Sequence, residues 1–357
     1  MMRLTFVRRY ESSLGLNLML PLAAVAASLV LCSGLILLAG ANPLSAYAII
    51  AKASLGGKFA ITETLAKAAP MILTGLAAAI AFRARFWNIG GEGQLLLGAM
   101  AAAFIGAQSA LPAFALIPLM IVLGAVSGGL GAMLPAFLKA RFKVDDVVST
   151  LMLNFIILYL MLALLSGPWK DTATGWPDSP DILRAAEFPN LWRGTRLHLG
   201  VLIAVLAAVA TWFLVKRMTL GFAIDAVGEN ARAAHHAGYS VPRIMLVTAA
   251  ISGALAGLAG VGEVAGIQYQ VMGSISPGYG YSGLVVAMLA RLNPLGVLPS
   301  AVFLAAVTAG ADEMSRQTGV PVFLADVIQG VTLLSMLVAL LFSTHRLKLD
   351  RPRRRAA

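Results

Sequence analysis

Residues 18–41 read LMLPLAAVAASLVLCSGLILLAGA, a run of 24 residues without a charged side chain. About 20 apolar residues in a helix suffice to cross the hydrocarbon core of a bilayer. Arg3, Arg8 and Arg9 precede the run, as in a secretory signal, but the run is too long for the apolar part of a signal peptide. We therefore expect a retained first membrane span.

Nine further apolar runs follow the first one. They cover residues 64–82, 93–111, 114–138, 147–166, 199–215, 244–262, 281–291, 294–311 and 320–342. Hydrophobic residues make up 59% of the chain, charged residues only 12%, and the mean hydropathy is +0.85, whereas a soluble domain carries about 25% charged residues. The sequence predicts an all-α membrane protein, a polytopic bundle of about ten transmembrane helices in one domain, residues 1–357.

The distribution of lysine and arginine predicts the orientation. With ten spans, both termini and the loops 83–92, 139–146, 216–243 and 291–293 share one side, which carries 19 of the 27 basic residues. Because lysine and arginine accumulate in cytoplasmic loops, both termini are predicted to be cytoplasmic. The net charge of +11 is spread over short loops rather than one face, which argues against nucleic-acid binding.

Two loops are long enough for a function of their own. Residues 167–198 are predicted to be extracytoplasmic, either as a cap at the membrane interface or as a rim on which an extracellular partner docks. Residues 216–243 are predicted to be cytoplasmic, with a short helix over Ala226–Ala237 that ends at Gly238. That helix is either a mere connector or a contact for a cytosolic partner.

Polar side chains inside apolar spans are costly, so they mark either a transport pathway or contacts between helices. The candidates for a translocation pathway are Asn88, Glu92, Gln94, Asn154, Glu263, Gln268, Asp326 and Gln329. The spacing of Gly124 and Gly128, and of Gly253 and Gly257, predicts close helix packing instead.

The sequence lacks the motifs of several enzyme classes. It has no GxxxxGK[ST], HExxH, CxxC or GxSxG, so we expect no nucleotide hydrolysis, no bound cofactor and no metal site in this chain. His235 and His236 are adjacent and would point about 100° apart on a helix, which makes a poor metal pair. Cys32 is the single cysteine, which excludes an internal disulfide.

Three motifs carry a family resemblance: AAPMILTGL (68–76), FWNIGGEGQ (86–94) and AVGENARAAHHAG (226–238). With them the chain resembles permeases of the ABC importers for simple sugars, nucleosides and branched-chain amino acids. The resemblance implies that the third motif is the coupling helix, which enters a groove on an ATPase subunit. This role falls to Ala226, Val227, Gly228, Glu229, Asn230, Ala231, Arg232, Ala233, Ala234 and Gly238. Asp225 departs from the family, which commonly has a basic residue there.

The segment SGPWKD and the Trp- and Pro-rich stretch after it (166–177) resemble the larger permease subunit of nucleoside importers. This implies a bacterial inner membrane, an ATPase subunit that binds ATP-Mg, a second and different permease, and an extracytoplasmic binding lipoprotein. A ribose-type sugar permease is the main alternative. Two readings from other classes are an ion-driven transporter with Asp326 as its ion site and a structural scaffold.

Overall fold

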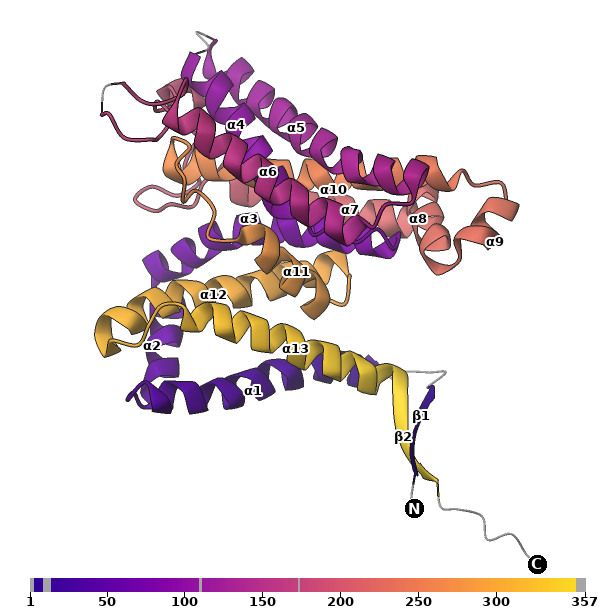
Figure 1. Ribbon diagram of the computed structural model, residues 1–357. Helices are drawn as coiled ribbons and strands as arrows, with labels where there is room; N and C mark the ends of the chain where they lie inside the picture. The colour runs from indigo at the N-terminus through magenta and orange to yellow at the C-terminus, as the bar shows by residue number, and fades with distance from the viewer. Residues whose placement is uncertain (1–2, 9–13, 109–110, 173, 351–357) are drawn as a thin grey trace, which may run out of the picture. The chain divides into compact units, whose positions relative to one another are not determined.

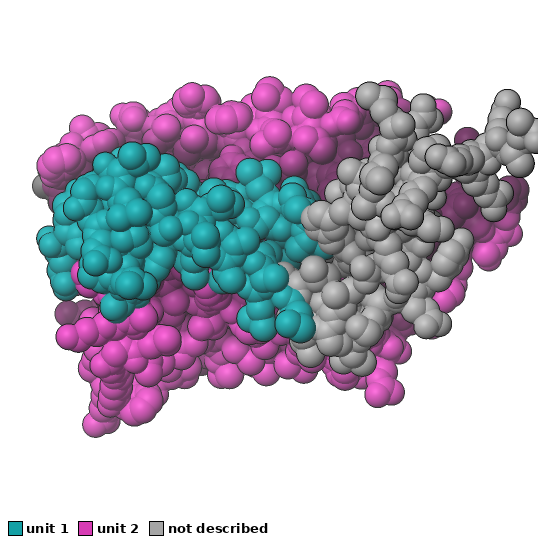
Figure 2. Space-filling view, turned by 90° about the horizontal axis from the view of Figure 1, so that it is seen from below, with its two compact units in different colours: residues 1–48, 314–357 teal, residues 49–313 magenta. Residues whose placement is uncertain are grey.

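A computed structural model of the chain describes residues 3–8, 14–108, 111–172 and 174–350. The chain divides into two compact units, which Figure 2 colours separately. One unit comprises residues 1–48 and 314–357, and the other comprises residues 49–313. The boundaries fall within two helices, α2 (Pro43–Leu55) and α12 (Pro294–Thr318).

The first unit joins the two ends of the chain. Helices α1 (Leu14–Leu38) and α13 (Leu324–Thr344) run side by side (Figure 1), and the hydroxyl of Thr332 donates to the hydroxyl of Ser28 at 2.9 Å. Strands β1 (Arg3–Arg8) and β2 (His345–Asp350) pair antiparallel, with Arg3 opposite Asp350. Neither this short sheet nor helix α2, which follows α1 after a bend of 114°, is predicted by the apolar runs.

The second unit is a helical bundle around α3 (Lys58–Arg83), where 89% of the most apolar stretch is buried. Helix α10 (Val241–Glu263) packs against α3 and also against α4 (Gly91–Gln108) and α5 (Ala113–Phe142) (Figure 1). The other elements are α6 (Asp146–Ser166), the 3₁₀ turn η1 (Arg184–Ala186), α7 (Leu199–Arg217), α8 (Thr219–Glu229), α9 (Ala231–His236), the π-helical turn η2 (Val264–Gln268) and α11 (Tyr279–Leu289).

Glycines bring α5 and α10 into backbone contact, which confirms the packing role predicted for the two glycine pairs. A side chain at Gly128 would collide with the carbonyl oxygen of Gly253, and one at Gly257 would collide with that of Gly124. Each pair thus leaves room for the backbone of the other helix, as small residues do between membrane helices.

The turn between α5 and α6 follows from its residues. Lys143 ends α5 in the left-handed conformation, with φ 58°. Asp145 then caps α6, because its Oδ1 accepts a hydrogen bond from the backbone nitrogen of Val148 at 3.0 Å. The break predicted at 139–146 is therefore confirmed.

Each of the ten predicted runs overlaps a helix, but fewer helices qualify as spans by length and apolarity. Six qualify within the described residues, or up to seven if the bent pair α1 and α2 forms one span. Of the others, α4 begins with the polar stretch from Glu92 to Gln94, and α11 has only 11 residues. The described structure therefore supports a multi-pass helical protein, without reaching the count of ten.

Candidate coupling loop and polar pathway

The segment predicted as one helix over Ala226–Ala237 consists of two helices, α8 and α9, so this prediction was wrong in its details. The helical conformation is interrupted at Asn230, whose backbone is extended, with φ −155° and ψ 100°. The side chain of Asn230 accepts hydrogen bonds from the backbone nitrogens of Arg232 and Ala233, both at 3.1 Å, and so begins a new helix. The predicted end is confirmed, since Gly238 has φ +90°.

The residues assigned to coupling divide into a buried and an exposed set. Val227, Gly228 and Ala234 are buried against the chain itself, and Ala226 beside them is half-buried. The stretch from Glu229 to Ala233 is exposed, and so is Gly238. Only this exposed set is available to a partner, while the buried set ties the loop to the bundle.

Two contacts hold α8 against the end of α3. The guanidinium of Arg83 forms a bidentate ion pair with Asp225, in which Nε donates to Oδ1 at 2.8 Å and Nη2 donates to Oδ2 at 2.5 Å. A side chain at Gly228 would collide with the backbone carbonyl of Arg83. Because the two helices are in close backbone contact and share a bidentate ion pair, a displacement of α8 is transmitted directly to α3. The unusual Asp225 thus faces the chain's own Arg83.

A surface cavity of about 400 Å³ lies beside this loop. It is lined by residues from four segments: Ala84, Arg85, Lys139, Val227, Gly228, Glu229, Asn230, Ala231, Arg232, Val241 and Met245. The lining residue Lys139 donates to the carbonyl of Arg85 at 2.8 Å and pairs with Asp146 at 2.6 Å. The exposed coupling residues therefore border a concave, basic surface.

Two of the pathway candidates, Asn88 and Gln94, form a closed pair of side-chain amides. Each donates to the other, at 2.9 and 2.8 Å, and Asn88 also donates to the hydroxyl of Ser252 at 2.9 Å. Ser252 in turn donates to the carbonyl of Ala77 at 2.7 Å. All these groups are buried, so in this conformation they join α3, α4 and α10.

The candidates Asn154 and Glu92 form hydrogen bonds to backbone groups of neighbouring segments. Asn154 accepts from the backbone nitrogen of Gly93 at 2.8 Å and donates to the carbonyl of Ile89 at 3.0 Å. Glu92 accepts from the backbone nitrogen of Gly280 at 2.7 Å, where α4 meets α11.

The remaining candidates occupy two separate places. Glu263 ends α10 and Gln268 ends the π-helical turn η2 that follows, with Glu263 almost fully buried and Gln268 half-buried. Asp326 is exposed in the first turn of α13 and belongs to the first unit. The side chain of Gln329 lies outside the part of the chain that the structure describes. No cluster of His, Cys, Asp or Glu suited to a metal ion occurs among the described residues.

Sequence comparisons identify the family. The family described as "Branched-chain amino acid transport system / permease component" matches residues 60–337. The chain belongs to this permease family. A glucose ABC transporter permease protein of Haloferax volcanii is 33% identical over 344 residues, which cover 94% of this chain and 90% of that protein.

Two further relatives are permeases for nucleosides. A guanosine ABC transporter permease protein of Bacillus subtilis is 36% identical over 321 residues, 89% of this chain and 92% of that protein. A nucleoside ABC transporter permease protein of Lactococcus lactis subsp. cremoris is 31% identical over 327 residues, 87% of this chain and 88% of that protein. The family predicted from the three motifs is confirmed. This membership favours the ABC permease over the two alternative interpretations, the ion-driven transporter and the structural scaffold.

The permease also has a group of charges in α3 that sequence reasoning missed. Lys67 lies inside the predicted span 64–82, and its Nζ pairs with Oδ2 of Asp312 at 2.9 Å. Glu63 lies one turn before Lys67 and is 3.5 Å from Arg196. A lysine within an otherwise apolar span was the available signal, but its partner Asp312 is 245 residues away along the chain.

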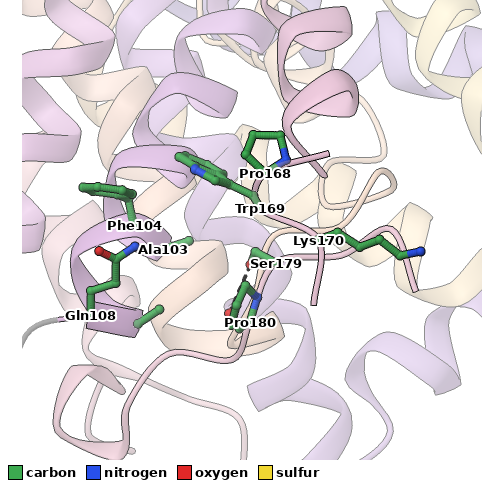
Figure 3. A pocket seen from close by; sticks show the side chains of 9 residues that line it. Ala103, Phe104, Gln108, Pro168, Trp169, Lys170, Ser179 and Pro180 are labelled. Atoms are coloured by element: carbon green, nitrogen blue, oxygen red, sulfur yellow. Dashed lines mark hydrogen bonds between the residues drawn. The ribbon is translucent and has the colours of Figure 1, made fainter. Parts of the chain in front are cut away.

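Backbone hydrogen bonds join the loop 167–198 of the permease to the helical bundle. Its backbone nitrogens donate to carbonyls of η2 and the residues after it, for example from Phe188 to Ala265 at 2.7 Å and from Ile182 to Tyr269 at 2.8 Å. Trp169 stacks on Phe104 of α4, with ring centres 5.7 Å apart. Figure 3 shows the pocket of about 160 Å³ that these two rings form with Pro168, Ser179 and Pro180.

His198, the last residue of this loop, is buried against η2. Its Nδ1 accepts from the backbone nitrogen of Gly200 at 3.1 Å, while its Nε2 has no partner among the described residues. A side chain at Gly266 would collide with its ring. Burial lowers the pKa of His198 to about 4, so the imidazole is neutral at pH 7.

Proposed function

We propose that this permease is the membrane subunit of an ATP-driven importer for nucleosides. The observation that carries the coupling role is the seat of α8 on α3, where Gly228 touches the Arg83 carbonyl and Asp225 holds the Arg83 guanidinium. Two relatives that cover most of the chain are permeases for guanosine and nucleosides, which supports the substrate class. The exposed stretch from Glu229 to Ala233 supplies the contact with an ATPase subunit.

The proposed mechanism is alternating access. Closure of two ATPase subunits around ATP-Mg pushes the exposed end of the coupling loop, and the Arg83–Asp225 pair passes this displacement to α3. Because α3 contacts α7, α10 and α11, its movement changes the packing of the bundle core. The free energy comes from the difference in ATP affinity between the two conformations of the complex.

The proposed topology has ten spans, with both termini in the cytoplasm of a bacterial cell. Contacts between the loops support it, because the segments expected on the cytoplasmic side touch one another. Arg83 contacts Asp225 and the carbonyl of Leu292, and Lys139 contacts Asp146 and the carbonyl of Arg85.

The proposed partners complete the importer. They are an ABC ATPase that binds ATP-Mg, a second and different permease subunit, and an extracytoplasmic binding lipoprotein that delivers the nucleoside. The loop 167–198 faces the binding protein, and the pocket between Phe104 and Trp169 gives this loop a rigid concave feature.

A simple-sugar importer is the second candidate. The glucose permease relative, 33% identical over 94% of this chain, favours it. Both candidates transport neutral molecules rich in hydroxyl groups.

Uptake measurements distinguish the two candidates. Cells with and without the chain and its partner subunits are supplied with labelled guanosine, adenosine, ribose or leucine. We expect loss of guanosine and adenosine uptake alone when the chain is deleted. Loss of ribose uptake with unchanged nucleoside uptake would instead establish the sugar importer.

A further inference from the structure

The surface cavity of about 400 Å³ beside the coupling loop adjoins the exposed residues of that loop. Six of its eleven lining residues, from Val227 to Arg232, belong to the loop itself. The others come from the end of α3 and from α5 and α10: Ala84, Arg85, Lys139, Val241 and Met245. A protein surface that covers the exposed stretch from Glu229 to Ala233 would therefore also lie over the cavity.

Positive charge predominates in the lining of this cavity. Arg85, Lys139 and Arg232 are cationic, whereas Glu229 is the one acidic side chain among the lining residues. Lys139 already pairs with Asp146 at 2.6 Å. Arg85 and Arg232 are exposed, and neither forms an ion pair with another described residue. Two unpaired arginines against one glutamate leave a net positive charge, which attracts an anionic group.

The backbone at Arg85 is held in an uncommon conformation. Its φ is 52°, in the left-handed region that residues other than glycine rarely adopt. The nitrogen of Arg85 donates to the carbonyl of Phe82 at 3.0 Å, and its carbonyl accepts from Nζ of Lys139 at 2.8 Å. Such a conformation persists where the surrounding structure fixes it, often at a functional site. Lys139 thus positions the backbone of Arg85, while the Arg85 guanidinium has no partner among the described residues.

A second surface cavity, of about 410 Å³, shares Lys139 with the first one. Its charged lining residues are two cations and two carboxylates, namely Lys139, Lys143, Asp145 and Asp146. Of these two cavities, only the one that borders the coupling loop therefore has a surplus of positive charge.

We propose that the cavity beside the coupling loop receives an acidic side chain of the ATPase subunit, with Arg85 and Arg232 as its partners. Guanidinium groups suit this role because their planar donors match the two oxygens of a carboxylate. The inference rests on the proposed coupling role of the loop. It adds a second contact, in which the ATPase subunit enters the permease.

An anionic lipid headgroup would carry the same charge as an acidic side chain. The position of the cavity favours the protein, because its loop wall from Val227 to Arg232 lies outside the apolar runs and continues into the exposed coupling residues.

Zero-length cross-linking tests the contact directly. Arg85→Lys and Arg232→Lys keep the positive charge and supply a primary amine, which a carbodiimide joins to a carboxylate only at contact distance. The assembled complex of both permeases and the ATPase subunit is treated and digested, and the joined peptides are identified by mass spectrometry. We expect each variant to give a cross-link from position 85 or 232 to an Asp or Glu of the ATPase subunit. A complex that assembles normally without either cross-link would overturn the inference.

Charge reversal measures the strength of the contact. Arg85→Glu and Arg232→Glu should each weaken binding of the ATPase subunit about tenfold, as the loss of one hydrogen bond between charged groups allows. Lys143→Glu is the matched control, because this exposed lysine of the second cavity undergoes the same change of charge. It should change the affinity less than about twofold. Equal losses in all three variants would indicate a general attraction between the surfaces and contradict the cavity contact.

The composition of the bilayer distinguishes the lipid from the protein. The purified pair of permeases is placed in nanodiscs of phosphatidylcholine alone, or of phosphatidylcholine with phosphatidylglycerol, before the ATPase subunit is added. We expect the same tenfold difference between wild type and the two cavity variants in both bilayers. A difference that occurs only with phosphatidylglycerol would assign the cavity to the lipid headgroup instead.

Failure of the proposed coupling role gives a different result. If no ATPase subunit binds the wild-type permease, both that role and the cavity contact are wrong. If the ATPase subunit binds the wild type and the cavity variants equally well, the coupling role stands and only the cavity contact is wrong.

Discussion

At position 225 the family resemblance implies a basic residue, whereas this chain has aspartate, and the structure directs that carboxylate toward Arg83 of the same chain. The partner of Asp225 is 142 residues away along the chain, and sequence alone could not reveal it. The ion pair is partly exposed, with 18% and 40% of the two side chains accessible. It therefore contributes little to the free energy of unfolding, and its main effect is to hold α8 in a fixed position on α3.

Charge exchange tests this pair. Arg83→Asp and Asp225→Arg should each uncouple ATP hydrolysis from transport, because each leaves two like charges between α3 and α8. The double variant restores opposite charges, and we expect it to recover part of the transport, with a coupling energy of about 0.5–3 kcal/mol. The measurement is guanosine taken up per ATP hydrolysed.

Exchange of Lys67 and Asp312, an ion pair of α3 with α12 that does not involve α8, is the matched control. Normal coupling in both single variants at positions 83 and 225 would show that α8 does not act through this pair.

His198 predicts a pH dependence of stability. The pKa of His198 is about 4 in the folded chain and about 6.5 in the unfolded chain, so the unfolded chain binds the proton first as the pH falls. Stability is therefore complete above pH 6.5 and is lost between pH 6.5 and 4. At pH 5 the loss amounts to about 2 kcal/mol.

Thermal unfolding of the purified chain at pH 7.5 and pH 5 measures this loss. His198→Asn keeps an acceptor for the backbone nitrogen of Gly200 and removes the titration, so its unfolding temperature should fall less at pH 5. The exposed His236→Asn serves as control. Equal falls for wild type and His198→Asn would contradict the assignment.

At the scale of helices, the apolar runs located the long helices well, and the motif 226–238 located the coupling loop. The break at Asn230 was missed because Ala226–Ala237 has strong helix propensity, which the side-chain cap of Asn230 overrides locally. Helix α2 was missed because it follows the first run after a sharp bend and contains Lys52.

The site was harder to predict than the helices. Asn88, Gln94 and Asn154 were found as polar residues within or beside spans, but the sequence could not show that they hydrogen-bond to buried groups of neighbouring segments. Conversely, Glu63 and Asp312 lie just outside apolar runs, where charges are ordinary, and only the folded structure pairs Asp312 with Lys67 and Glu63 with Arg196.

The cap at Asn230 offers a test of the α8–α9 break. Asn230→Ala removes two hydrogen bonds and should destabilise α9 by about 1 kcal/mol. We expect faster amide hydrogen exchange in Ala231–His236 and weaker binding of the ATPase subunit. Asn293→Ala, which removes a cap from α12, is the control and should leave both unchanged in the coupling loop. Unaltered exchange in α9 would mean that the cap is dispensable.

At the scale of the molecule, the ten-span topology predicts opposite sides for the two long loops. With Cys32→Ser as background, Thr172→Cys should react with an impermeant thiol reagent applied to intact cells, and Ala237→Cys should react only after lysis. Both positions are exposed in the structure, so reagent access is limited by the membrane alone. Labelling of both positions from one side would rule out this topology.

The central claim is that an ATPase subunit drives transport through this chain. Proteoliposomes that contain the permease, its second permease and its ATPase, with the binding protein present, are supplied with labelled guanosine. We predict accumulation that requires ATP and that Gly228→Val abolishes, since a side chain there collides with the Arg83 carbonyl. Accumulation without the ATPase subunit, driven by an ion gradient, would contradict the account.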